Sequence, residues 1–253
     1  MEFNLYDVLA ALALVGVAVG LSLYQKVKLE KDILIGTIRS FVQLIAIGYA
    51  LEFIFDLNNL YLLILTILIM ITIGAYTGGR RADISYSGFT ISFIAIGIGT
   101  FFTIGSMLLL RIINTDPKYL IPIAGMIVGN SMNASALALD RIDSEVKNKK
   151  AQIETALALG ATSSQAIESS VRATVKASMI PIINLMKIIG LVQLPGAMTG
   201  MILAGASPVS AVIIQIIVVY MLVCATTISS VLTTVLAKQQ YFTPDHQLAE
   251  ILG

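Results

Sequence analysis

The polar residues of this sequence stand out because long apolar runs surround them. Asn130, Ser131 and Asn133 lie in one such run, and another run holds Arg39 and Gln43, four residues apart. That spacing places Arg39 and Gln43 on one face of a helix. Polar groups at membrane depth bond to neighbouring helices or line the path of a solute. Both interpretations stay open, and all five residues are candidates for a substrate path.

An interruption in a further apolar run is the second place where chemistry is expected. The stretch "LPGAMTG" (Leu194–Gly200) contains Pro195, Gly196 and Thr199. Proline and glycine free backbone carbonyl and amide groups, which membrane proteins tolerate where the chain lines a cavity or is covered by protein. These three residues are therefore also candidates for the substrate path.

The sequence offers few residues for metal or redox chemistry. It contains one cysteine, Cys224, and one histidine, His246, so the usual zinc and iron–sulfur ligand sets cannot be assembled from it. Asp7, Glu52 and Asp140 map to the ends of apolar runs and form no ligand cluster. Metal ligands therefore stay unknown. A metal cargo would cross as a chelate, bind between two subunits, or not be the direct substrate.

Two rival classes of membrane protein need residues that the apolar runs do not contain. An intramembrane enzyme needs a nucleophile with a base, paired aspartates or a metal site within the runs. An ion-coupled secondary transporter of a small solute, the main alternative, needs a carboxylate in mid-membrane and inverted repeats. We find neither set in the sequence and assign no catalytic residue.

The composition sets the fold class. Of 253 residues, 57% are hydrophobic and 12% are charged, whereas soluble domains carry about a quarter charged residues. Lipid is therefore the main solvent, and backbone groups in lipid bond within their own helix. We predict an all-α polytopic membrane protein with a single transmembrane permease domain over residues 1–253. The net charge of +1 gives no reason to expect a nucleic acid partner.

Seven segments have the roughly 20 apolar residues that cross a bilayer as a helix. They are Leu5–Tyr24, Ile33–Phe55, Leu60–Thr77, Phe89–Leu110, Leu120–Leu139, Met179–Ala204 and Val209–Leu236. The sixth contains the "LPGAMTG" stretch and is either a straight span or a bent or re-entrant one. Gly125 and Gly129 in the fifth permit close helix packing. The hydroxyl residues at 226–234 in the seventh favour a packing or dimer face over a pore.

Basic residues predict the orientation, because cytoplasmic loops carry an excess of Lys and Arg. Twelve of them fall on one side of the predicted spans: Lys26, Lys28, Lys31, Arg80, Arg81, Arg141, Lys147, Lys149, Lys150, Arg172, Lys176 and Lys238. The opposite side has Arg111 and Lys118. We predict that the N-terminus lies outside the cell and the C-terminus in the cytoplasm.

The segment from about residue 140 to residue 178 is predicted to be a cytoplasmic helical hairpin. Good helix formers run from Asp143 to Gly160, a typical C-terminal cap, and Thr162 with Gln165 fits a capping box that starts a second helix. The turn at Gly160 and Ala161 would present small side chains to a partner protein. The alternative is that the segment only extends the two neighbouring spans.

The sequence "ETALALG" within this hairpin resembles the cytoplasmic "EAA" loop of ABC importer permeases. In those proteins a Glu, small residues and a Gly six places on form the helix that docks on the ATPase, and Glu154 and Gly160 have that spacing. The importer pattern places its proline closer to the glycine than Pro181 is here. The resemblance implies that Glu154, Ala156, Gly160 and Ala161 are ATPase-coupling residues.

A broader resemblance covers Ile38 to Leu236. The runs "IRSFVQLIAIGY", "IVGNSMNASALALDR", "ETALALGAT" and "INLMKIIGLVQLPGAMTGMILAG" are similar, in this order, to the FetB family of ABC transporter permeases, which is implicated in bacterial iron export. The resemblance implies an inner (plasma) membrane permease that pairs with a second copy and a separate ATPase. No G-x-x-x-x-G-K-[ST] motif occurs in the chain. We therefore expect ATP and Mg²⁺ on the partner ATPase and no cofactor in this chain.

Overall fold

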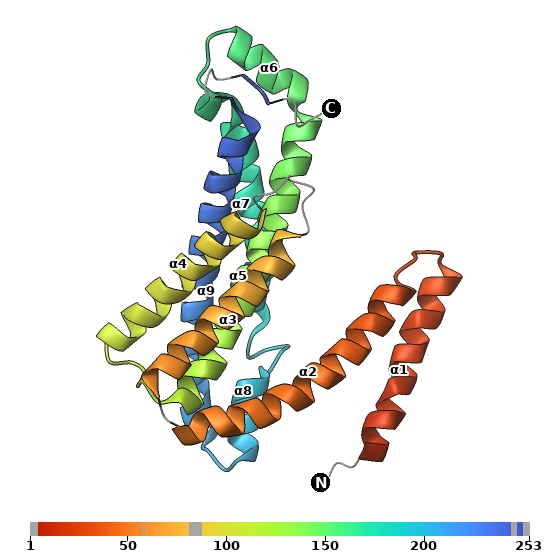
Figure 1. The fold of residues 1–253 in the computed structure, drawn as a ribbon, viewed down its shortest axis with the longest axis vertical. Coiled ribbons are helices and arrows are strands. Elements are labelled where there is room, and N and C mark those ends of the chain that lie inside the picture. Colours follow the sequence, from red (N-terminus) through yellow and green to blue (C-terminus); the bar gives the residue numbers. More distant parts are fainter. Residues whose placement is uncertain (1–4, 58, 81–87, 244–246, 250–253) are drawn as a thin grey trace. The chain divides into compact units, whose positions relative to one another are not determined.

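The computed structural model describes residues 5–57, 59–80, 88–243 and 247–249, and these residues are almost entirely helical (Figure 1). The predicted all-α fold is confirmed over the described residues. Arg81 and His246 lie outside them.

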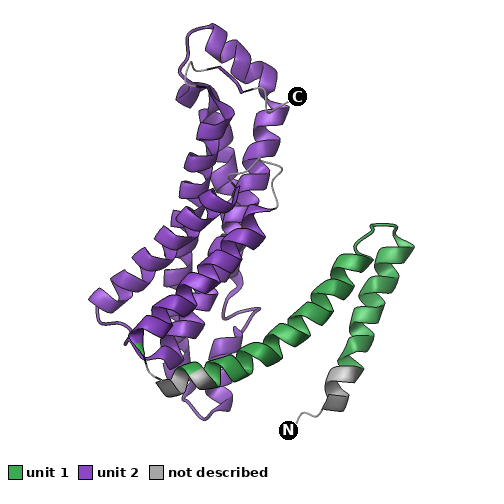
Figure 2. Ribbon diagram, viewed as in Figure 1, with its two compact units in different colours: residues 1–59 green, residues 60–253 purple. Residues whose placement is uncertain are grey.

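The chain forms two compact units, residues 1–59 and residues 60–253 (Figure 2). The first unit contains α1 (Leu5–Tyr24) and α2 (Glu30–Leu57), which pack against each other. Ser22 fixes the connection between them, because its hydroxyl donates to Glu30 Oε2 (3.1 Å) and accepts from the Leu29 N–H (3.0 Å).

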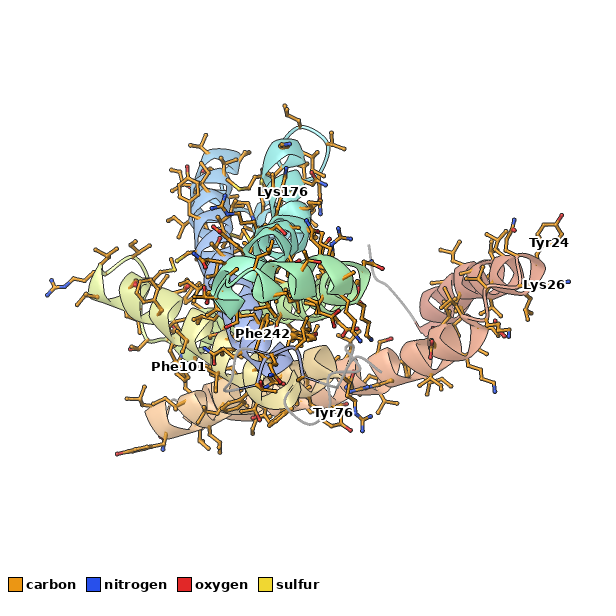
Figure 3. The ribbon with its side chains drawn as sticks, turned by 90° about the horizontal axis from the view of Figure 1, so that it is seen from above. Tyr24, Lys26, Tyr76, Phe101, Lys176 and Phe242 are labelled. Atoms are coloured by element: carbon orange, nitrogen blue, oxygen red, sulfur yellow. The ribbon has the colours of Figure 1, made fainter. Side chains whose placement is uncertain are left out.

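The side chains of the first unit project on all sides of its two helices (Figure 3). Packing against α1 buries no residue in the most apolar window of α2. Exposed apolar helices of this kind are covered by lipid or by other protein.

The described residues of the second unit form a bundle of five long α-helices, with two short α-helices at its ends and a 3-10 turn at Gln239–Tyr241. The long helices are α3 (Leu60–Gly79), α4 (Gly88–Leu109), α5 (Pro117–Asn148), α7 (Ser163–Ile188) and α9 (Pro208–Lys238). Helix α5 packs against the other four long helices, and α9 packs against α4, α5 and α7. The short helices α6 (Lys150–Ala158) and α8 (Gly196–Leu203) lie at opposite ends of the bundle (Figure 1).

Local sequence explains where the long helices begin. Proline occupies the first turn of α5 and α9, where its missing N–H costs no hydrogen bond. The capping box predicted for α7 is present: the Gln165 N–H donates to Thr162 Oγ1 (3.3 Å) and the Thr162 N–H donates to Gln165 Oε1 (2.9 Å).

Five described helices are long and apolar enough to cross a membrane, namely α2, α3, α4, α5 and α9. The predicted sixth span, Met179–Ala204, is not one straight helix. Helix α7 ends at Ile188, the chain turns at Gly190 with a φ of +80°, and Pro195 then starts the eight residues of α8. That the chain crosses the membrane seven times stays a prediction.

The predicted helix from Asp143 to Gly160 is wrong in one respect, because it breaks at Lys149. Helix α5 continues to Asn148, and α6 starts at Lys150 in a new direction (Figure 1). The break allows Ile153 of α6 to be buried, which stabilises this arrangement by roughly 1.5–3 kcal/mol.

Glycines bring α3 and α4 close to the two central helices. A Cβ on Gly78 would lie 3.3 Å from the Met132 carbonyl oxygen of α5, and one on Gly99 would lie 2.9 Å from the Ala225 carbonyl oxygen of α9. The two glycines of α5 that permit close packing are less tightly covered within the described residues: a Cβ on Gly125 would meet Met70 Cε at 4.0 Å, and one on Gly129 would have no neighbour within 4 Å. The close contacts therefore use glycines of the partner helices.

The contact at Gly99 gives a test of this packing. In Gly99→Ala the added methyl meets Ser229 Oγ at 2.5 Å and a backbone oxygen that cannot rotate away, so we expect a loss of about 1–3 kcal/mol in unfolding free energy. The matched control is Gly97→Ala on the same helix, where the Cβ has no neighbour within 4 Å. Unfolding in detergent micelles measures both, and equal stabilities of the two variants would contradict the α4–α9 contact.

Candidate functional site

The turn between α6 and α7 is the first candidate site, and we call residues 150–165 the elbow. Gly160 adopts a φ of +88°. Its N–H donates to the Leu157 carbonyl (2.9 Å), and the Ala161 N–H donates to the Ala156 carbonyl (3.0 Å). These two bonds form a Schellman motif, in which glycine tolerates the left-handed conformation best. The turn predicted at Gly160 is therefore present.

A buried apolar cluster attaches the elbow to the bundle. Ile153 of α6 is 2% exposed. It belongs to the elbow cluster, whose buried members are Ile91, Leu139, Ile142, Val146, Ile153, Ile167, Ala237 and Tyr241. Phe242, labelled in Figure 3, packs against this cluster from the segment after α9. The cluster joins α6 to α4, α5, α7 and α9, so a displacement of the elbow reaches the long helices.

Ion pairs join successive turns at the end of α5, just before the elbow. Lys149 Nζ lies 2.7 Å from Glu145 Oε2, and Lys147 Nζ lies 2.7 Å from Asp143 Oδ2. The Tyr241 hydroxyl donates to Asp143 Oδ1 (3.2 Å). These residues lie beyond the apolar part of α5, and the hydrogen bond from Lys149 holds the pKa of Glu145 below its usual value.

The outer surface of the elbow is exposed. Glu154 and Gly160 face solvent, and a Cβ on Gly160 would have no neighbour within 4 Å. Ala156 and Ala161 are half-buried. Leu159 is 85% exposed. The sequence analysis did not single it out, although its position just before the capping glycine could have indicated an exposed residue.

Hydroxyl groups connect the long helices in the interior of the bundle. The Ser135 hydroxyl of α5 lies 3.0 Å from Ser92 Oγ of α4 and 2.9 Å from Thr233 Oγ1 of α9. Ser178 of α7 is hydrogen-bonded to Ser230 of α9. All of these side chains are buried. The hydroxyls predicted at 226–234 thus include several that bond between helices.

The structure separates the polar residues predicted on α5. Ser131 is fully buried inside the bundle, and its hydroxyl has no hydrogen-bond partner among the described residues. Asn133 is exposed, whereas Asn130 is half-buried and donates to the Met126 carbonyl of its own helix (2.9 Å). Asn130 and Asn133 therefore share an open face of α5, and Ser131 does not.

Arg39 and Gln43 lie in α2, which belongs to the other compact unit. Both side chains are exposed. Within the described residues no ion pair involves Arg39, and no group of three His, Cys, Asp or Glu side chains is arranged to hold a metal ion.

The break between α7 and α8 borders a cavity of about 340 Å³. Pro195 caps α8 and its carbonyl accepts from the Thr199 N–H (3.0 Å), whereas Gly196 and Thr199 are exposed. These three predicted residues shape the turn and do not line the cavity. Gln215 of α9 does line it. The sequence analysis missed Gln215. Its isolated amide in the apolar run "AVIIQIIVVY" could have marked it as a polar group inside a membrane span.

Comparisons with known proteins agree with a membrane protein. The model of the uncharacterised protein family UPF0014 matches residues 5–242. The chain is 41% identical to UPF0014 membrane protein STAR2 of Oryza sativa subsp. japonica, over 94% of this chain and 84% of that protein. It is 38% identical to the "Probable iron export permease protein FetB" of Escherichia coli, over 94% of this chain and 92% of that protein. No solved structure matches. With its long apolar helices, the chain is a multi-pass membrane protein.

The hydrogen bonds of Ser135 to Ser92 and Thr233 give the second test of the packing between helices. Ser135→Ala leaves the buried hydroxyls of Ser92 and Thr233 without this partner, so we expect a loss of about 1–3 kcal/mol in unfolding free energy. The control is Ser106→Ala, because that hydroxyl bonds to the Phe102 carbonyl of its own helix and changes stability by less than about 0.5 kcal/mol. Indistinguishable unfolding of the two variants would show that the interhelical bonds contribute nothing.

Proposed function

Because the chain belongs to the UPF0014 family, we propose that it is the membrane-spanning permease subunit of an ATP-driven ABC transporter. Its 38% identity to a protein named as a probable iron export permease supports iron, another metal or a metal chelate as the exported cargo. ATP and Mg²⁺ would bind a separate ATPase subunit, and two copies of the permease would pair over two ATPases.

The proposal places the chain in the inner (plasma) membrane with the N-terminus outside and the elbow and C-terminus in the cytoplasm. The distribution of Lys and Arg supports this orientation. Helix α7 has 26 residues, which corresponds to about 39 Å of helix. With Arg172 and Lys176 on the cytoplasmic side, only residues 177–188 of this helix remain for the bilayer, which is about 18 Å. A complete crossing therefore also needs the break and α8, and seven crossings follow if residues 179–204 count as one.

The observation that carries the proposal is the contrast between the buried side of α6 and the exposed residues of α6 and of the turn that follows it. Ile153 is buried in the elbow cluster, whereas Glu154, Leu159 and Gly160 are exposed. An ATPase that binds the exposed face pushes on a helix whose other face is attached to α5, α7 and α9. Glu154 would pair with a Lys or Arg of the ATPase, and the leucine would enter an apolar pocket.

Leu159→Asp tests this surface. A charge in the centre of an apolar contact costs about 2 kcal/mol or more, so we expect the affinity of the permease for the ATPase, and the stimulation of ATP hydrolysis, to fall by about tenfold or more. Co-purification with a candidate ABC ATPase subunit from the same organism and ATPase assays in nanodiscs measure both quantities.

The matched control is Leu191→Asp in the break between α7 and α8. Leu191 is 89% exposed and lies at the other end of the bundle, so the same change there leaves ATPase binding intact. The unfolding midpoint of both variants is measured in the same nanodiscs, and the comparison uses only variants that keep the midpoint of the unmodified chain. An unchanged ATPase affinity in Leu159→Asp would remove the elbow from the proposed interface.

A further inference from the structure

Three sulfur-containing side chains line one cavity between α4 and α9, and we call Met107, Met221 and Cys224 the sulfur cluster. The cavity has a volume of about 210 Å³, and all three residues contribute to its wall. Met107 and Met221 are 6% and 3% exposed, and Cys224 is half-buried. The cluster belongs neither to the elbow nor to the break between α7 and α8.

The packing of α4 against α9 brings the cluster together. The two helices run in opposite directions, since the start of α4 and the end of α9 both contribute to the elbow cluster. A Cβ on Gly99 would meet Ser229 Oγ at 2.5 Å. Met107 lies eight residues further along α4 than Gly99, and Met221 lies eight residues earlier in α9 than that serine. The same register therefore places the two methionines opposite each other. Cys224 follows Met221 by three residues, on the same face of α9.

Sulfur ligands select a narrow class of metal ion. Thiolates and thioethers prefer Cu(I), whereas iron is bound in proteins mainly by imidazole and carboxylate ligands when no sulfide is present. None of the described residues that line the cavity carries a charge at neutral pH, and an isolated cation there would lose its hydration without compensation. Cu(I) with one thiolate and two neutral thioethers forms a site with no net charge. The cluster therefore matches a soft monovalent cation in charge as well as in ligand type.

We propose that the sulfur cluster binds one Cu(I) ion, with the Cys224 thiolate and the thioethers of Met107 and Met221 as its three ligands. Binding replaces the proton of the thiol, which passes to water, and the copper stays Cu(I) because no electron is transferred. The site is formed within this chain and needs neither ATP nor an ATPase. The proposal therefore does not rest on the proposed transport function.

The experiment titrates the purified full chain with Cu(I) in detergent without oxygen, in competition with the chelator bathocuproine disulfonate. The colour of the copper chelate measures how much Cu(I) moves to the protein. Cys224 is the only cysteine of the sequence, so alkylation by N-ethylmaleimide, measured by mass spectrometry, reports on this thiol alone. We expect one Cu(I) per chain and alkylation that is about tenfold slower or more with the metal bound. Fe(II) at the same concentration leaves the alkylation rate unchanged.

Methionine variants distinguish a site with three ligands from a single thiol. Met107→Leu and Met221→Leu each keep a side chain of similar volume and remove one sulfur. We expect each to weaken Cu(I) binding about tenfold or more, and Cys224→Ser to abolish it. The matched control is Met186→Leu on α7, outside this cavity, which leaves the Cu(I) affinity unchanged.

X-ray absorption at the copper edge tests the same site without a variant. On the unmodified chain loaded with one equivalent of Cu(I), we expect three sulfur neighbours around the copper. One sulfur with oxygen or nitrogen neighbours would overturn the proposal, even if a methionine variant failed to fold. Cu(I) affinities of Met107→Leu and Met221→Leu equal to that of the unmodified chain would also overturn it, because the thiol alone would then hold the metal.

Discussion

Ile153 packs among side chains from α5, α7 and the end of α9, and this contact connects the surface of the elbow to the membrane helices. The break at Lys149 exists in a sequence of good helix formers because it lets this side chain be buried. Gly160 then reverses the chain in the left-handed conformation, which keeps Glu154 and Leu159 on the exposed side. Without Ile153 in its cluster, α6 would be a surface helix that transmits nothing to the bundle.

The interior of the bundle is suited to a protein that changes conformation. Neutral hydroxyl pairs such as Ser135 with Thr233 hold helices together in lipid, yet each bond contributes only about 1 kcal/mol. Glycine contacts such as Gly99 against α9 bring the helices close without interlocking side chains. Helices joined in this way can exchange partners at a lower cost than helices joined by buried ion pairs, a property that the proposed transport function requires.

Local signals in the sequence predicted much of the fold, and contacts between distant residues account for what it missed. Apolar length located α1 to α5 and α9, whereas the start of α7 followed from the Thr162–Gln165 capping box, which is present as predicted. The break at Lys149 depends on the burial of Ile153 by other helices, which no local pattern records. Likewise, Ser131 and Asn133 are two residues apart but face opposite environments, because the neighbours of α5 decide which face is buried. Gln215 gains its significance from a cavity that three segments form together.

The measurement that tests the transport claim most directly is the uptake of radioactive iron into inverted membrane vesicles that contain this chain and its ATPase. Export from the cell appears as accumulation inside such vesicles. Our account predicts accumulation that requires ATP hydrolysis and is lost when either the permease or the ATPase is omitted. Iron accumulation that is the same with and without ATP, with both proteins present and folded, would contradict it.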